Sequence, residues 1–247
     1  MRRFGVVSCL FAFLACGGSD GGSGDGGGGA AADAPLGSAS ISGMVMFTGD
    51  APANPAIDMA EEAVCAARYS EGPMDPIVSV TDGHLANVFI RVVGGLPDGP
   101  YPVPSGPARV NQDGCLYHPR VLGMMVGQEL EITNSDSTAH NIKAVPTESR
   151  GFNVSQPRSM VTTRRGFASP EIMVPLECSM HGWMNAYVGV VEHPYFATSG
   201  ADGSFTISGL PAGTYQVEAW HETLGTQSGE ATVAADGSAS LNFTFGG

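Results

Sequence analysis

The run Cys178-Ser179-Met180-His181-Gly182-Trp183-Met184 decides how this sequence is interpreted, because it places three potential metal donors on one short connection. The runs 172–176 and 187–191 on either side of it are rich in β-branched and apolar residues and predict strands. A fourth donor, His140, lies upstream in a polar stretch that follows the alternating run 129–133. We therefore expect a β-structure that carries its chemistry in the connections between strands.

The four donors His140, Cys178, His181 and Met184 form a mixed nitrogen and sulfur set. Two imidazoles and one thiolate, with a weak axial thioether, are what a type 1 (blue) copper centre requires. Zinc accepts thiolate and imidazole but has little use for a thioether. A dinuclear copper site would need a second cysteine in the same loop, which holds only Cys178. The set predicts one mononuclear copper ion; the alternative is that these are core side chains without a metal.

The same residues resemble the cupredoxin family, with the loop spacing of its amicyanin and plastocyanin-like members. The likeness joins the stretch 126–142, which ends in Ala-His-Asn-Ile, to the C-x-x-H-x-x-M loop, and it covers residues 109–194. It implies a Greek-key β-sandwich that binds copper through His140, Cys178, His181 and Met184. The segment 109–117 departs from the family pattern because it contains an extra cysteine, Cys115.

The cupredoxin resemblance also implies roles for residues beside the ligands. Asn141 would tie the two ligand loops together and tune the sulfur through a backbone hydrogen bond. His181 would be the more exposed imidazole, through which electrons enter or leave. Trp183 would shield the site or line that exit, and ordinary packing is the alternative. We expect a carrier of single electrons that exchanges them with a redox protein.

The rest of the chain also predicts strands, so we expect an all-β protein. Glycine is abundant, with 35 residues of 247, and charged residues make up only 14%, which argues against a helical bundle. The one plausible helix is 59–69, with Asp58 as its N-cap. Further strands are expected at 40–48, 84–93, 201–207 and 216–221, and the segment 229–245 is expected to turn as a hairpin at Asp236-Gly237.

The segment 202–222, DGSFTISGLPAGTYQVEAWHE, resembles the carboxypeptidase regulatory-like (transthyretin-like) β-sandwich family. That family usually opens with a strand such as 41–47 here. We therefore expect strands of an outer sandwich at 38–105, some of which could complete the cupredoxin-like domain. That copper domain is placed at 106–196 and the carboxypeptidase regulatory-like domain at 197–247. Two arrangements remain open, a cupredoxin-like domain inserted into the outer sandwich or two domains in tandem.

The N-terminal segment predicts export from the cytoplasm. Arg2 and Arg3 precede the apolar stretch 4–15, which is too short to span a bilayer and suits a secretory signal. The stretch ends in Leu14-Ala15-Cys16 and resembles a bacterial lipobox, with an ordinary signal peptide as the alternative. Residues 16–37 are rich in Gly, Ser and Asp and predict a flexible tether. We expect a signal peptide at 1–15, a lipid on Cys16, and a protein held at a bacterial membrane outside the cytoplasm, in the periplasm or at the cell surface.

Cysteine usage fits that compartment. After Cys16 three cysteines remain, Cys65, Cys115 and Cys178, and in an oxidising compartment two of them should pair. Sequence alone allows every pairing among the three. Because Cys178 sits in the donor loop, we assign the disulfide to Cys65 and Cys115.

Charge and motifs exclude several functions. The formal net charge is −13, and such an acidic chain does not suit nucleic-acid binding. There is no catalytic triad, phosphate-binding loop or acid/base carboxylate pair, and protein donors would fill all four metal positions, so we do not expect an enzyme. Two alternatives to an electron carrier remain, a copper-binding or copper-delivery protein and a surface binding module with a non-functional cupredoxin fold.

Overall fold

The chain folds almost entirely into strands, which confirms the expected fold class. The computed structural model describes residues 33–157 and 161–246, and within them the only helix is α1 (Ala63–Ala66). The predicted signal peptide, the lipidation site Cys16 and most of the predicted tether lie outside the described residues. No helix in the described part of the chain is long and apolar enough to cross a membrane.

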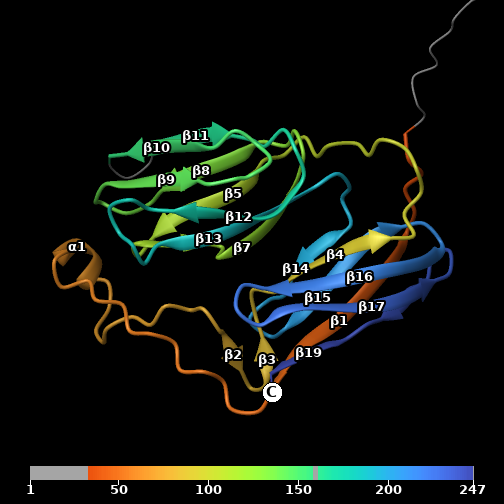
Figure 1. The fold of residues 1–247 in the computed structure, drawn as a ribbon, viewed down its shortest axis with the longest axis horizontal. Coiled ribbons are helices and arrows are strands. Elements are labelled where there is room, and N and C mark those ends of the chain that lie inside the picture. Colours follow the sequence, from red (N-terminus) through yellow and green to blue (C-terminus); the bar gives the residue numbers. More distant parts are fainter. Residues whose placement is uncertain (1–32, 158–160, 247) are drawn as a thin grey trace, which may run out of the picture. The chain divides into compact units, whose positions relative to one another are not determined.

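The described strands run along the whole chain (Figure 1). Their bounds are β1 (Ala39–Thr48), β2 (Val80–Thr81), β3 (His84–Leu85), β4 (Phe89–Gly94), β5 (Ala108–Asp113), β6 (Leu116–His118), β7 (Val121–Met125), β8 (Leu130–Asn134), β9 (His140–Ala144), β10 (Phe152–Gln156), β11 (Val161–Arg165), β12 (Glu171–Glu177), β13 (Asn185–Val191), β14 (Phe196–Thr198), β15 (Ser204–Leu210), β16 (Gly213–His221), β17 (Gly225–Val233), β18 (Ser238–Ser240) and β19 (Phe243–Gly246).

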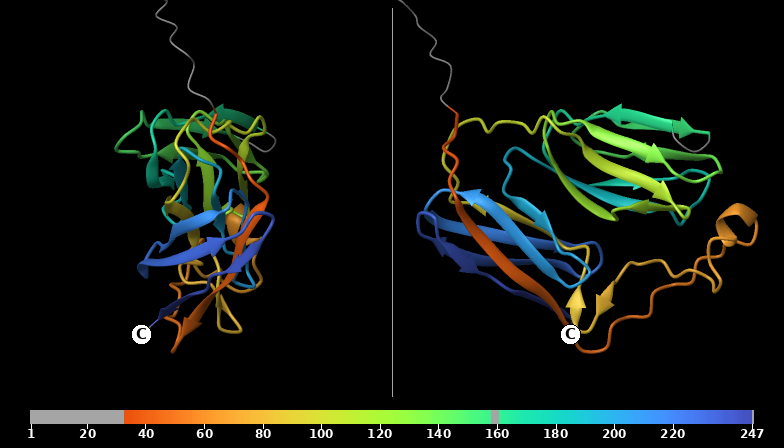
Figure 2. Two further views of the ribbon diagram at one scale, coloured as in Figure 1. Left: turned by 90° about the vertical axis from the view of Figure 1, so that its right-hand side faces the viewer. Right: turned by 180° about the vertical axis from the view of Figure 1, so that it is seen from behind.

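Strands from the two ends of the chain share sheets, which we call the outer sandwich. One sheet has the order β15-β1-β3-β2, with β18 and β19 also paired to β1, and the other has the order β14-β4-β16-β17. In both views of Figure 2 the orange β1 lies among the blue C-terminal strands. Between β4 and β14 the chain builds β5 to β13, so the outer sandwich is interrupted by another set of strands.

The strands β5 to β13 form two sheets of their own, which we call the central sandwich. Their orders are β10-β9-β12-β13-β7 and β11-β8-β5-β6. Alternation explains the packing, because in β8 the side chains of Leu130 and Ile132 are buried while Glu131 and Thr133 between them are more exposed. The core includes Val110, Ile142 and Val188 together with the predicted ligands Cys178 and Met184. The ligand segments therefore belong to the core of this sandwich.

A glycine pair lets aromatic side chains of β4 and β14 approach the central sheet. Gly123 in β7 and Gly189 in β13 are paired in register. A Cβ atom at Gly123 would lie 2.3 Å from the Phe196 ring, and one at Gly189 would lie 2.5 Å from the Phe89 ring. Such distances exclude any side chain at these positions unless the rings move. Phe89 packs there in a small apolar cluster with Val121 of β7.

Three local expectations were wrong. The predicted strand 84–93 is split into β3 and β4, because Asn87 adopts a φ of 61° that breaks the extended chain. The turn at Asp236 does not close a hairpin, since β17 pairs with β16 whereas β18 pairs in parallel with β1 in the other sheet. The predicted helix 59–69 shrinks to α1, where Asp58 accepts a hydrogen bond from the Ala60 N–H instead of capping the helix. Only Cys65 of α1 is buried, so little packing supports a longer helix.

Candidate metal centre

The loop between β12 and β13 is held by its own backbone. The Cys178 N–H donates to the Met184 carbonyl over 3.2 Å, and the Met184 N–H donates to the His181 carbonyl over 2.9 Å. These bonds make the loop compact and direct the Cys178 and Met184 side chains into the core, where both are buried. Met180, in the same loop, is 49% exposed. The loop therefore buries Met184 and exposes Met180.

The structure brings the predicted imidazole and thiolate donors together. His140 begins β9 and is fully buried, and its Nδ1 lies 2.9 Å from Nδ1 of His181. Cys178 Sγ lies 3.8 Å from the same His181 nitrogen, and donor atoms of all three residues lie within 4.8 Å of one another. Donors bound to one ion at about 2.0–2.3 Å lie at most about 4–5 Å apart. The three residues therefore fit a single metal ion.

The neighbouring groups shift the pKa values of the clustered Cys178, His140 and His181. Burial raises the pKa of the Cys178 thiol, but hydrogen bonds from His140 and from the backbone N–H groups of Asn141, Met180 and His181 outweigh it, so its pKa is lowered. Burial lowers the pKa of His140, but its bonds to Asp136 and Cys178 outweigh this and raise it to about 9. Burial and the neighbouring His140 lower the pKa of His181. These shifts make the Cys178 thiol easier to deprotonate, and metal binding requires that deprotonation.

Asn141 connects the two ligand segments. Its side-chain oxygen accepts a hydrogen bond from the Ser179 N–H over 2.7 Å, and its amide nitrogen donates to Asn153 over 2.8 Å. The same oxygen lies 3.3 Å from Cys178 Sγ. Asn141, a residue of β9, therefore connects this strand to the loop that holds the sulfur.

Asp136 was not singled out by sequence reasoning, although it contacts a proposed ligand. Its Oδ2 lies 2.9 Å from Nε2 of His140, and it is 2% exposed. The backbone N–H groups of Gly114 and Cys115 donate to its two oxygens at 2.8 Å each. The sequence signal was its position four residues before His140, but the run Ser-Asp-Ser reads as an ordinary turn.

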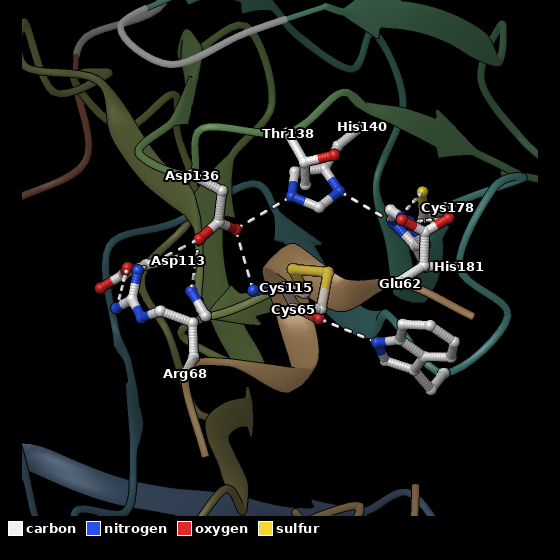
Figure 3. Close-up of a disulfide and its surroundings, with 12 residues drawn as sticks. Glu62, Cys65, Arg68, Asp113, Cys115, Asp136, Thr138, His140, Cys178 and His181 are labelled. Carbon is white, nitrogen blue, oxygen red and sulfur yellow. Dashed lines mark hydrogen bonds and ion pairs between the residues drawn. A yellow bond between two sulfur atoms is a disulfide. The ribbon is translucent and has the colours of Figure 1, made fainter. Parts of the chain in front are cut away.

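His181, which is expected to be the more exposed imidazole, has hardly more accessible surface than His140. Both imidazoles are buried, and His181 is only 2% exposed. Residues 58–69, which include α1 and which we call the cap, lie against it, with Glu62 Oε1 3.5 Å from His181 Nε2 (Figure 3). Trp183 stacks on His181 at a ring-centroid distance of 5.1 Å and is half-buried. The two side chains that contact His181, Trp183 and Glu62, are therefore partly exposed, whereas His181 is buried.

The cap is fastened to the turn between β5 and β6. Cys65 and Cys115 form a disulfide with an S–S distance of 2.00 Å, and Cys178 is a free, buried thiol. Figure 3 shows the disulfide between the cap and the Asp136 side chain, with Arg68 of the cap reaching Asp113 and Asp136. The Tyr69 hydroxyl donates to the Gly114 carbonyl over 2.7 Å, and the Trp183 ring N–H donates to the Cys115 carbonyl over 3.0 Å. Cap, disulfide and ligand loop are one connected structure.

Two other groups of donor side chains lie nearby in the described residues. One is formed by Glu62, Cys65 and His181, and the other by Cys115, Asp136 and His140. Each contains a cysteine of the disulfide, whose sulfur is not available as a thiolate. The candidate metal centre is therefore the group formed by His140, Cys178 and His181.

Comparison with known proteins gives one family match. Residues 183–246 match the carboxypeptidase regulatory-like domain family. This range covers β13 of the central sandwich and β14 to β19 of the outer sandwich, and the outer part agrees with the resemblance seen in the sequence. It begins within the ligand loop, ahead of residue 197 where the sequence placed the start of that domain. No curated protein matches the chain.

Similar solved structures are copper proteins with low similarity. A purple cupredoxin from Nitrosopumilus maritimus is 23% identical, with a TM-score of 0.29, and the match covers 34% of this chain and 98% of that one. A reduced amicyanin variant is 20% identical, with a TM-score of 0.31 and coverage of 36% and 85%. A copper-containing nitrite reductase from Thermus scotoductus is 21% identical, with a TM-score of 0.33 and coverage of 40% of this chain but only 25% of the reductase. At these TM-scores the similarity carries no argument about the function of this chain.

Proposed function

We propose that the central sandwich binds one copper ion as a mononuclear type 1 centre and carries single electrons between redox partners. The observation that supports this most directly is the convergence of His140 Nδ1, His181 Nδ1 and Cys178 Sγ within 4.8 Å in a buried cluster. Copper bound there supplies a reversible one-electron change between Cu(II) and Cu(I). Met184, buried in the same core, is the axial donor of this proposal.

The surrounding residues supply rigidity and exclude water. Cys178 and Met184 are fixed by the backbone bonds of their loop, and His140 is fixed by β9 and by Asp136. Donors that cannot move keep a similar geometry for both oxidation states, so little rearrangement opposes electron transfer. Both imidazoles are buried, which disfavours the copper-delivery alternative, because a delivery site must open its ligands to a recipient. All four donor positions come from the protein, so we propose a carrier and not an enzyme.

The partner would meet the protein at Trp183 and the cap. Trp183 stacks on His181 and is half-buried, whereas His181 itself has almost no accessible surface. We therefore replace the exposed-imidazole exit with a route that passes the Trp183 side. The partner is a redox protein, and the net charge of −13 argues for no role in nucleic-acid binding.

The proposal places the protein outside the cytoplasm of a bacterium, anchored by a lipid on Cys16. The lipobox-like sequence at Leu14-Ala15-Cys16 motivates the anchor. The disulfide between Cys65 and Cys115 supports an oxidising compartment, since such bonds persist mainly in secreted and periplasmic proteins. Mass spectrometry of the membrane fraction tests the anchor, and an unmodified Cys16 in the mature chain would contradict it.

The test of the copper proposal is the optical spectrum and metal content of the purified protein after loading with Cu(II). We expect one copper per chain, intense visible absorption and a reversible one-electron wave. Cys178→Ala should abolish the colour completely, because the absorption arises from the bond between copper and the thiolate. A colourless protein with bound copper, or no stoichiometric copper, would overturn the proposal and leave the surface binding module as the alternative.

The loop contains a second methionine, Met180, which serves as the matched control for the proposed axial donor Met184. Met184→Leu should change the spectrum and raise the reduction potential, because a thioether donor is replaced by a hydrocarbon. Met180→Leu, in the same loop but 49% exposed, should leave both unchanged. Equal behaviour of the two variants would contradict the role of Met184.

A further inference from the structure

Both imidazoles of the metal centre have a carboxylate at their outer nitrogen, but the two contacts differ. Asp136 is 2% exposed and lies 2.9 Å from His140 Nε2. Glu62 is 41% exposed and lies 3.5 Å from His181 Nε2. A buried contact at hydrogen-bond distance is strong, whereas an exposed and longer one is screened by water. The pair therefore offers one effective partner and one weak partner in the same site.

The Asp136 carboxylate is held so that it cannot turn away from His140. Its Oδ1 accepts from the Gly114 N–H and its Oδ2 from the Cys115 N–H, both at 2.8 Å. Its own N–H donates to the Asn134 side chain over 2.9 Å, and Arg68 lies 3.4 Å from Oδ1. Both oxygens therefore accept hydrogen bonds from fixed backbone donors, as a carboxylate does, and Oδ2 also faces Nε2 of His140.

This contact determines which nitrogen of His140 faces the ligands. With Nε2 donating its proton to Asp136, the lone pair of a neutral His140 is on Nδ1, the atom 2.9 Å from Nδ1 of His181. A negatively charged acceptor on the outer nitrogen also makes the imidazole a stronger electron donor. A stronger donor favours the more positive oxidation state of a bound ion.

Resting on the function proposed above, we infer that Asp136 is a positioning residue that fixes the ring and tautomer of His140 and favours Cu(II) over Cu(I). Glu62 does not perform this role for His181. The prediction is directional, because removing the charge of Asp136 should raise the reduction potential. Outer partners of metal-bound histidines typically contribute about 10-fold to 100-fold in metal affinity.

The experiment compares Asp136→Asn with Glu62→Gln in the copper-loaded chain. We expect Asp136→Asn to weaken Cu(II) binding relative to Cu(I) by about tenfold or more, which is a potential increase of about 59 mV or more for one electron. Glu62→Gln should change that ratio by less than about threefold, as expected for an exposed contact. A ratio that changes no more in Asp136→Asn than in Glu62→Gln would overturn the inference while the wild-type spectrum still supports the copper proposal.

A second readout does not need copper. In the metal-free protein the Nε2 proton of His140 should give a slowly exchanging, strongly shifted NMR signal, because it is buried and bonded to a carboxylate. Loss of that signal in Asp136→Asn but not in Glu62→Gln supports the positioning role. The same signal in the wild type, in Asp136→Asn and in Glu62→Gln would overturn the positioning role. This test does not depend on copper uptake, so it separates a failure of the inference from a failure of the proposed function.

The Asn variant places an amide NH₂ group against a backbone N–H donor, because each carboxylate oxygen already accepts one. Urea unfolding therefore accompanies both measurements. If Asp136→Asn does not fold, Asp136→Ser takes its place, since a hydroxyl oxygen can accept a backbone bond without carrying charge. The same two comparisons with Glu62→Gln then decide the inference.

Discussion

The outer and central sandwiches share one architecture but bury different kinds of side chain. The core of the outer sandwich contains apolar residues such as Ile41, Val92 and Val217, and its buried polar side chains include Ser199 and His221. The interior of the central sandwich includes Gln112, Asn134, Asp136, Asn141 and both ligand histidines. Buried polar groups must be hydrogen-bonded to avoid a penalty of about 1–3 kcal/mol each. The comparison teaches that the central sandwich buries more polar side chains than the outer one, and that some of them, such as Asp136 and Asn141, contact the candidate ligands.

The largest expected effect on stability comes from Arg120, which forms buried ion pairs with Asp75 and Glu222. Arg120 is 8% exposed and bonds to Asp75 over 2.7 Å and to Glu222, in the turn between β16 and β17, over 2.9 Å. Arg120→Met would leave two carboxylates without their partner and should lower the free energy of unfolding by about 3–5 kcal/mol. Chemical denaturation measures it.

The control is an ion pair at the surface. Arg109 is 71% exposed and pairs with Glu131, so Arg109→Met should cost less than about 1 kcal/mol. Similar losses of unfolding free energy in Arg120→Met and Arg109→Met would mean that the buried ion pairs stabilise the protein no more than an exposed one.

The second prediction concerns the cap, which only the central sandwich has. Replacing Cys65 and Cys115 by serine removes a cross-link between residues 50 positions apart and should cost about 2–5 kcal/mol. It should also loosen the cap, so the metal-free protein should react several times faster at His181 with diethyl pyrocarbonate. Mapping of modified peptides measures this rate, with Glu61→Gln in the cap as the control. An unchanged rate would show that other contacts hold the cap in place.

The third and smallest effect is the pH dependence of stability that His193 causes. Burial lowers the pKa of His193, which stacks on Tyr195 after the end of β13, to about 4. The unfolded chain takes up the proton near pH 6.5 and the folded one does not, so stability is full above pH 6.5 and is lost as pH falls toward 4, by at most about 3 kcal/mol. His193→Gln should remove this part of the slope. Equal slopes in wild type and His193→Gln would refute it.

Much of the fold and the ligand cluster could be predicted because their signals are local. The alternation at 129–133 and the C-x-x-H-x-x-M loop each lie within a few residues, and the sulfur of Cys178 could be separated from the other cysteines by its motif. The cap over His181 could not be predicted, because Glu62 contacts His181 only through tertiary packing. The same holds for Asp136, whose role depends on N–H groups of Gly114 and Cys115 in another turn. Pairing of β18 with β1 was missed because a turn residue signals a reversal but not the sheet that the chain joins next.

One strand of the outer sandwich has a mechanical consequence. β1 is paired with β15 along most of its length, and with β18 and β19 on its other edge. Tension on the chain ahead of Ala39 would act along β1 and load these ladders in shear, so many hydrogen bonds would have to break at once. A pull from that end would therefore be resisted by the ladders of β1 before it strained the candidate metal centre, whose strands β9, β12 and β13 belong to another sheet.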